Sequence, residues 1–202
     1  MPRLVDHEVR RRQITDAARR VIVRGGLDAA TFQAVAAEAG MSVRLVQYYF
    51  GTKKEFLLGT LDSVVHAMAA RFTVELEGLG AEPEPRVALR TIGRALLPLD
   101  DIRRDEAKVL AAYQAARLSG SQSVPAETLD PAALLVRTAA EHIRRVRDDG
   151  PDTRAATELD AELFTVLVAG LSQSVLSGFH STERAAELLD HTVDRVLGSG
   201  GG

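Results

Sequence analysis

Residues 31–57, TFQAVAAEAGMSVRLVQYYFGTKKEFL, leave little freedom in local structure, because they predict two short helices separated by a tight turn. Thr31 and Ser42 are placed to cap these helices, since a hydroxyl oxygen there accepts from free backbone N–H groups of the first turn. Gly40 lies between the helices, where the chain needs a residue that tolerates a left-handed conformation. The stretch therefore predicts a helix-turn-helix.

The second of these helices has two different faces. Helical spacing turns three residues inward, Leu45, Val46 and Tyr49. The same spacing turns four residues outward, Val43, Arg44, Gln47 and Tyr48. Arginine, glutamine and tyrosine on the exposed face of so short a helix suit base edges and phosphates better than bulk water.

A third helix begins directly after the second. Thr52 and Glu55 have the spacing of a capping box, in which each side chain accepts from the backbone N–H of the other residue. Lys53 and Lys54 fall in the first turn, where the helix dipole disfavours cations. A phosphate bound to these lysines and to the free N–H groups would remove that conflict.

These residues resemble the DNA-binding signature of the TetR (tetracycline repressor) family. The resemblance covers about residues 8–60 and rests on Gly40-Met41-Ser42, Val46-Gln47-Tyr48-Tyr49-Phe50, Lys53 and Glu55. Many members carry Tyr at the position of Gln47 and His at that of Tyr49, so their base contacts cannot be copied onto this chain. An ordinary helical hairpin in an all-α protein is the alternative interpretation.

Nine residues form the predicted DNA-binding set. Arg44 and Gln47 are expected on bases, because arginine suits guanine and glutamine suits adenine, and Tyr48 is expected on bases or phosphate. The predicted phosphate contacts are Thr31, Ser42, Tyr49 and Lys53, and the set is completed by Gln33 and Val43.

The distribution of charge supports a nucleic-acid partner at one end of the chain. The whole chain of 202 residues carries a net charge of −3. Residues 1–55 contain ten Arg and Lys and six Asp and Glu, a net charge of +4, which leaves −7 for residues 56–202. A basic N-terminal head on an acidic body is the pattern expected of a protein that binds DNA with its head.

Periodicity and helix breakers predict an all-α fold of about nine helices. Besides the two short helices of the hairpin, they are expected at 8–24, from 53 through Phe72, and at 86–97, 101–118, 131–147, 157–179 and 182–197. We expect a helix-turn-helix DNA-binding domain at 1–52, a ligand-binding and dimerisation domain at 53–197 and a flexible tail at 198–202.

The helix predicted at 157–179 is apolar on more than one side, which indicates burial on more than one side. A core helix within a monomer is one explanation. The alternative we favour is a two-fold four-helix interface, which the TetR resemblance also implies, because two short recognition helices read twice the site that one reads. The predicted interface residues are Leu163, Val166, Leu167, Gly170, Leu171, Ser174, Leu188, Leu189, Thr192, Val193 and Val196.

Polar side chains recur within the apolar helical patterns of the body, as they do around a small-molecule pocket. The resemblance implies such a pocket, because TetR members are typically released from DNA by a ligand bound in the body. We expect an apolar or amphipathic effector in contact with some of Met68, Phe72, Tyr113, Arg117, His142 and Phe164. The segment from Arg103 to Tyr113 looks somewhat like the subgroup that includes the choline-responsive repressors.

The sequence argues against catalysis. Its five histidines show no HxxxH or HExxH spacing, and the chain has no GxSxG motif, no glycine-rich phosphate loop and no cysteine. We expect no enzyme, no metal and no cofactor. The N-terminus has no signal segment and no apolar run approaches the eighteen or so residues that span a bilayer, so we expect a soluble cytoplasmic protein without a membrane partner.

These observations predict a homodimeric, ligand-responsive DNA-binding transcriptional regulator, a repressor released from a palindromic operator by a small molecule. The alternative is a helical small-molecule-binding or adaptor protein without DNA binding.

Overall fold

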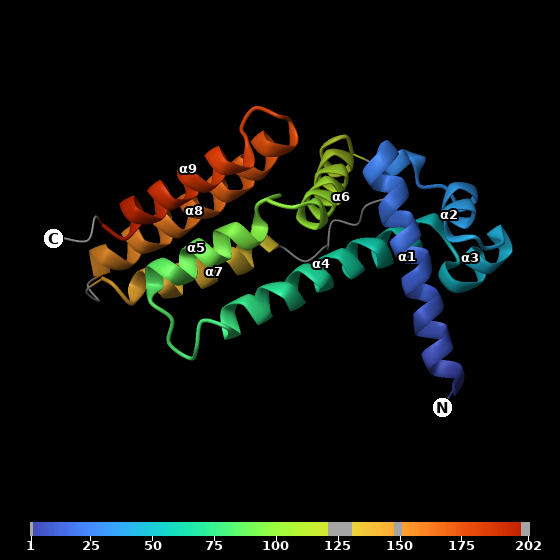
Figure 1. Ribbon diagram of the computed structural model, residues 1–202, viewed down its shortest axis with the longest axis horizontal. Helices are drawn as coiled ribbons and strands as arrows, with labels where there is room; N and C mark the ends of the chain where they lie inside the picture. Colours follow the sequence, from blue (N-terminus) through green and yellow to red (C-terminus); the bar gives the residue numbers. More distant parts are fainter. Residues whose placement is uncertain (1, 121–130, 148–150, 199–202) are drawn as a thin grey trace. The chain divides into compact units, whose positions relative to one another are not determined.

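The computed structural model describes residues 2–120, 131–147 and 151–198, and in these ranges the chain is all-α without a strand. The predicted fold class and the predicted number of helices are confirmed for this part of the chain. The helices are α1 (Pro2–Ala29), α2 (Phe32–Ala39), α3 (Val43–Phe50), α4 (Lys53–Glu77), α5 (Pro85–Leu96), α6 (Asp101–Leu118), α7 (Pro131–Arg144), α8 (Pro151–Leu176) and α9 (Thr182–Val196) (Figure 1).

α1 is longer than expected at both ends. The backbone is helical from Pro2, not from Glu8, and proline fits this first position because its missing N–H has no partner in a first turn. The predicted end at 25–26 is present as a kink, since Gly26 has φ 75° and ψ −178°, but helical structure resumes up to Ala29. The predicted tail at 198–202 lies outside the described residues except for Gly198.

The first of two compact units comprises residues 1–69 and 105–127. α1, α2, α3, the first part of α4 and most of α6 enclose one apolar core. α1 contributes Ile14 and Ala17 to it, α3 contributes Val46 and Phe50, and α4 contributes Phe56, all of them at most 2% exposed. The hairpin therefore rests on a core that both flanking long helices help to build.

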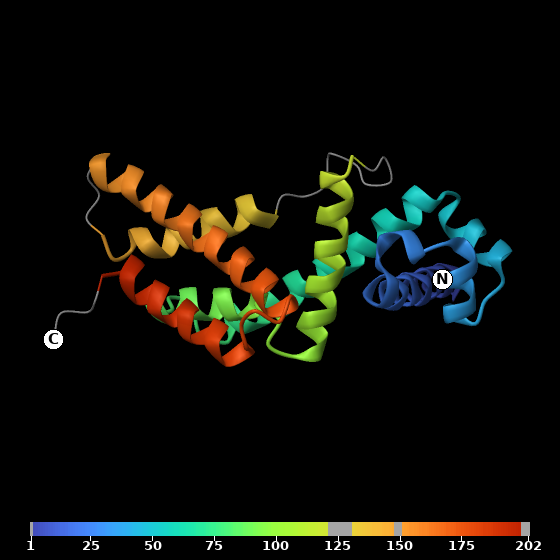
Figure 2. The same ribbon diagram turned by 90° about the horizontal axis from the view of Figure 1, so that it is seen from above.

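The second unit comprises residues 70–104 and 128–202. α5, α7, α8 and α9 pack around a core that includes Leu89, Ile143, Phe164 and Leu189, each of them 0% exposed. α8 and α9 lie side by side (Figure 2). α5 is joined to α9 by a ladder of ion pairs that runs from Arg86, Arg90 and Arg94 to Asp190 and Asp194.

α4 and α6 each contribute residues to both units. Phe56, Leu57 and Leu61 of α4 are buried in the first core, so in packing the start of α4 goes with the hairpin that precedes it. The functional boundary expected between residues 52 and 53 stays a prediction.

α8 is more apolar than the sequence analysis allowed. Within residues 153–176, a window of 18 residues has a mean hydropathy of 1.4, so by length and composition alone this helix is long and apolar enough to cross a membrane. The expectation that no segment approaches this limit was wrong on those criteria. A core helix passes the same test, and α8 buries Ala161, Phe164, Val168 and Leu171 in the second core.

Candidate nucleic-acid interface

The caps that shape the hairpin are present as predicted. The hydroxyl oxygen of Thr31 accepts from the N–H of Ala34 over 3.1 Å, and that of Ser42 accepts from the N–H of Leu45 over 3.2 Å. Gly40 has φ 64° and ψ 33°, the left-handed conformation that lets the chain leave α2 sharply. The turn between α2 and α3 is thus determined by residues within it.

α3 presents a polar outer face. Arg44, Gln47 and Tyr48 are exposed, and 76% of Tyr48 is accessible. Gln33 of α2 is also exposed. Val43 was expected to face outward, but it is partly buried against the first core, because it lies one helical turn before the buried Val46.

The start of α4 carries the predicted capping box. The N–H of Thr52 donates to Glu55 Oε2 over 3.3 Å, and the N–H of Glu55 donates to Thr52 Oγ1 over 3.2 Å. Lys53 and Lys54 follow in the first turn. Neither lysine has an ion-pair partner among the described residues, and the same is true of Arg44. These three cations are therefore free to meet an anion.

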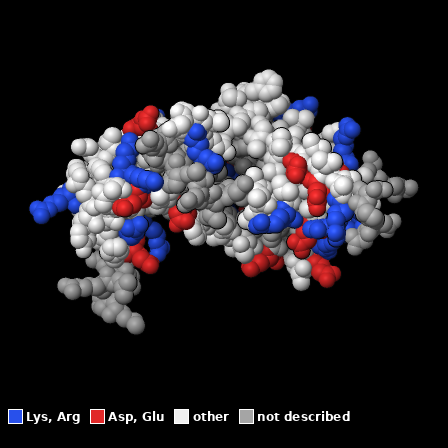
Figure 3. All heavy atoms as spheres, turned by 180° about the vertical axis from the view of Figure 1, so that it is seen from behind, with Lys and Arg blue, Asp and Glu red and all other residues white. Residues whose placement is uncertain are grey.

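Several other basic residues of the first unit are used within the protein. Glu38 of α2 accepts from both Arg24 and Arg20 of α1, and the hydrogen bond from Arg24, followed by that from Arg20, lowers the pKa of Glu38 below its ordinary value. Arg19 pairs with Asp105 of α6 over 3.7 Å. Basic and acidic side chains also lie next to one another on the face drawn in Figure 3. The count of basic residues in the sequence thus overstates the charge available to a ligand.

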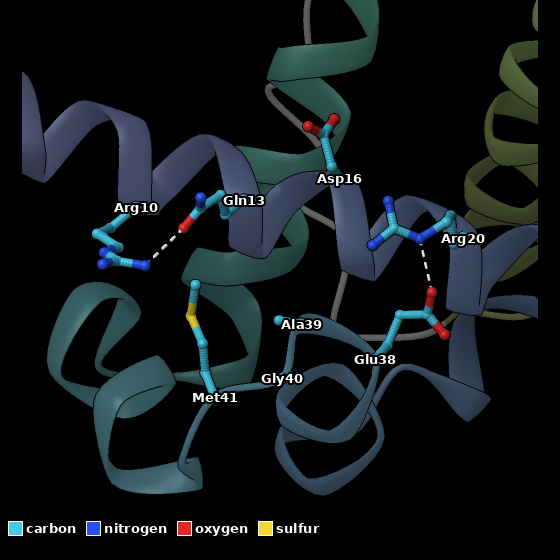
Figure 4. A pocket seen from close by; sticks show the side chains of 8 residues that line it. All are labelled: Arg10, Gln13, Asp16, Arg20, Glu38, Ala39, Gly40 and Met41. Carbon is cyan, nitrogen blue, oxygen red and sulfur yellow. Dashed lines mark hydrogen bonds and ion pairs between the residues drawn. The ribbon is translucent and has the colours of Figure 1, made fainter.

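A cavity of about 280 Å³ lies between α1 and the turn that joins α2 to α3. Figure 4 shows Arg20 paired with Glu38 on one side of it and Arg10 bonded to Gln13 on the other. The side chain of Met41 extends from the turn toward α1. Its charged lining is balanced, with two arginines, one aspartate and one glutamate. The cavity therefore favours neither an anion nor a cation.

Sequence reasoning missed Arg11 of α1. Its guanidinium Nη1 donates to the carbonyl oxygen of Tyr49 over 2.7 Å, and its Cζ lies 4.1 Å from the centroid of the Phe50 ring. The sequence shows Arg11 only as the middle residue of three successive arginines, and helical geometry merely excludes that all three point one way. The contact joins residues 38 apart in sequence, so no local pattern reveals it.

The structure divides the predicted dimer residues into three groups. Leu163 and Val166 are 62% and 68% exposed, and a Cβ added at the exposed Gly170 would meet nothing within 4 Å. Four residues are partly buried, namely Leu167, Ser174, Leu188 and Thr192. The remaining four pack in the chain's own second core and present almost no surface, namely Leu171, Leu189, Val193 and Val196.

The predicted ligand residues belong to different units. Met68, Tyr113 and Arg117 lie in the first, and Phe72, His142 and Phe164 lie in the second. The hydroxyl of Tyr113 already donates to the carbonyl oxygen of Leu57, and burial raises the pKa of Tyr113. Burial, followed by the nearby Arg145, lowers the pKa of His142. Their contact with an effector stays a prediction.

Residues 14–59 match the family described as bacterial regulatory proteins, tetR family. The chain is 44% identical over 57 residues to the HTH-type transcriptional regulator PksA of Bacillus subtilis, a match that covers 28% of each chain. It is 31% identical over 113 residues to the HTH-type transcriptional regulator BetI of Paraburkholderia phymatum, covering 56% of this chain and 57% of that one. The chain thus spans less than two thirds of the length of these relatives.

Solved structures resemble a larger part of the chain. A transcriptional regulator from Rhodococcus sp. Rha1 is 26% identical, with a TM-score of 0.78 over 93% of this chain and 95% of that one. A Saccharomonospora viridis protein described as a transcriptional regulator and solved with choline is 23% identical, with a TM-score of 0.75 over 93% of this chain and 96% of that one. The second likeness concerns the fold alone.

Proposed function

We propose that this chain, whose residues 14–59 match the tetR family of bacterial regulatory proteins, is a DNA-binding transcriptional regulator. The observation that carries the proposal is the outer face of α3, where Arg44, Gln47 and Tyr48 are exposed on a capped helix beside the unpaired Lys53 and Lys54. A major groove about 12 Å wide admits one such helix. In the groove, an exposed arginine can form two hydrogen bonds with the edge of a guanine, and an exposed glutamine can form two with the edge of an adenine.

Phosphates are the second part of the proposed site. The first turn of α4 offers Lys53 and Lys54 together with the free N–H groups of a helix N-terminus, and these attract an anion jointly. Thr31, Ser42 and Tyr49 are assigned the remaining phosphate contacts. Phosphate contacts fix the register of the protein on the duplex, whereas base contacts select the sequence.

The protein is proposed to act as a homodimer through α8. Leu159, Leu163 and Val166 are each more than 60% exposed and, at a spacing of four and three residues, lie on one side of that helix. A second copy would remove this apolar face from water, and two-fold symmetry would place two α3 helices in successive major grooves about 34 Å apart.

A small-molecule effector is proposed to release the dimer from its operator. The Saccharomonospora viridis protein was solved with choline, and a multidrug binding protein EbrR of the same fold was solved with imidazole, which supports a small-molecule effector. We assign the chain no catalytic activity and place it in the cytoplasm as a repressor. Thermal-shift screening of amphipathic metabolites, followed by gel shift with each compound that binds, tests the effector.

The DNA-binding proposal is tested by selecting duplexes from a random library and measuring binding at several salt concentrations. Arg44→Ala and Gln47→Ala should weaken binding to the selected duplex by about 1–3 kcal/mol each and relax its sequence preference. Lys53→Ala should weaken binding to all duplexes about equally and lower the salt slope by about one unit.

Lys108→Ala is the matched control for Lys53→Ala, because it removes the same charge from an exposed position on α6. Its salt slope should equal that of the wild type. Failure of the wild type to enrich any duplex would refute the proposal and favour a helical ligand-binding protein without DNA function.

A further inference from the structure

The C-terminus of the recognition helix α3 is held by a side chain from another helix. The last four carbonyl groups of any α-helix lack partners within the helix. In α3, the backbone carbonyl oxygen of Gln47 accepts from the N–H of Gly51 over 2.7 Å, and the carbonyl oxygen of Phe50 accepts from the N–H of Thr52. The backbone carbonyl oxygen of Tyr49 instead accepts from the guanidinium of Arg11, over 2.7 Å. The positive charge of this guanidinium also interacts favourably with the negative end of the helix dipole.

The same guanidinium covers the ring that anchors α3. Arg11 Cζ lies 4.1 Å from the centroid of Phe50, and Phe50 is only 2% exposed. On α4 the ring meets Gly59, where an added Cβ would come within 2.8 Å of Phe50 Cε1. One arginine therefore contacts both the backbone and the side-chain anchor at the end of α3, where α4 approaches as well.

α1 reaches the recognition helix at a second point, one helical turn earlier. The ring of His7 lies 4.7 Å from that of Tyr49, and residues 7 and 11 share a face of α1 because they are four apart. Tyr49 is thus held through its ring by His7 and through its carbonyl by Arg11.

We propose that Arg11 is a positioning residue for sequence recognition, which fixes the orientation of α3 without itself contacting DNA. The inference rests on the proposed function. Eight residues are too few for a helix that is stable alone, so the direction of α3 depends on its tertiary contacts. Bidentate bonds from Arg44 and Gln47 to base edges require that direction to be fixed, whereas lysine–phosphate contacts tolerate a change because the lysine stem is flexible.

The chemistry of the site requires arginine. A planar guanidinium donates to a carbonyl in its plane while its face lies on an aromatic ring. A lysine ammonium keeps the charge but is a compact, strongly hydrated point charge without a face to stack. Arg11→Lys therefore keeps the positive charge but removes the planar group that orients α3.

The test measures binding of wild type, Arg11→Met and Arg11→Lys to a duplex selected by the wild type and to a scrambled duplex of the same composition. We expect both variants to lose about tenfold in affinity for the selected duplex, as the loss of a hydrogen bond to a charged group implies, and little for the scrambled one. Hydrogen exchange in the free protein should become faster across residues 43–51.

Arg19→Met is the matched control. It removes the same charge from a partly buried position of α1, but its partner Asp105 lies on α6 and not on α3. It should keep the ratio of selected to scrambled affinity, even if its melting temperature falls as much as that of Arg11→Met.

Three results would overturn the inference. Unchanged selectivity in Arg11→Met and Arg11→Lys would show that α3 needs no such support. A salt slope lower by about one unit in Arg11→Met, but not in Arg19→Met, would make Arg11 a phosphate contact instead. Equal loss of selectivity in Arg19→Met would assign the effect to general destabilisation. By contrast, failure of the wild type to select any duplex would refute the proposed function itself.

Discussion

Tyr113→Phe removes one buried hydroxyl from the core of the first unit. Tyr113 is 3% exposed, and its hydroxyl ties α6 to α4 by donating to the carbonyl oxygen of Leu57 over 2.5 Å. That carbonyl also faces the N–H four residues on in its own helix, so the variant loses a hydrogen bond without leaving the acceptor bare. We expect the free energy of unfolding near neutral pH to fall by about 1 kcal/mol.

The difference in stability between the two proteins should reverse at alkaline pH. Burial raises the pKa of Tyr113 above its ordinary value of 10.0. The unfolded chain therefore ionises this phenol near pH 10 while the folded protein keeps it protonated. The contribution of the phenol to stability is fully present below that pH, and above it declines by about 1.4 kcal/mol per pH unit. An advantage of about 1 kcal/mol is then cancelled at roughly pH 10.7.

Urea denaturation of both proteins, followed by circular dichroism at one protein concentration from about pH 7 to pH 11, measures this difference. Tyr48→Phe is the matched control, because it removes the same phenol hydroxyl from a residue that is 76% exposed. A Tyr113→Phe protein as stable as the wild type at neutral pH would refute the hydrogen-bond argument. A difference that stays constant up to pH 11 would refute the burial argument.

Three further substitutions test other parts of the fold. Gly170→Arg, at an exposed position of α8, should produce monomers in sedimentation analysis that no longer bind DNA, whereas Gly170→Ala should remain dimeric; a dimeric arginine variant would move the interface elsewhere. Gly93→Ala should lower the free energy of unfolding, measured in urea, by about 1 kcal/mol, because its Cβ would lie 2.5 Å from Cδ1 of the buried Leu189. The cost of this overpacking exceeds the gain in helix propensity, and a more stable variant would contradict the prediction. Ser42→Ala should cost about 1 kcal/mol by removing the cap of α3, and Ser42→Thr should cost less.

The sequence predicted the hairpin in detail because its determinants act over a few residues. Each cap bonds an N–H three positions away, from Thr31 to Ala34 and from Ser42 to Leu45. Gly40 changes the chain direction by its own conformation. Such signals do not depend on the rest of the fold, and the resemblance they carried is confirmed by the family match over residues 14–59.

Local sequence patterns do not predict contacts between distant segments of the chain. The bond from Arg11 to Tyr49 spans 38 residues, and no periodicity selects Arg11 from the run of three arginines. The same limit applies to α8 and α9. Periodicity identified two apolar helices, but it did not distinguish side chains that face the chain's own core, such as Val193, from those that remain exposed, such as Val166.

α3 is stabilised from the side that faces away from the proposed DNA site. Eight residues with one capping serine form a marginal helix in water. Val46 and Phe50 anchor α3 in the core, and Arg11 fixes its C-terminus. Base contacts are worth only a few kcal/mol each and depend on direction, so a small rotation at Phe50 would weaken together all the base contacts proposed for α3. Substitutions that alter sequence selectivity should therefore occur at Arg11, Phe50 and Gly59 as well as at the residues that face the groove.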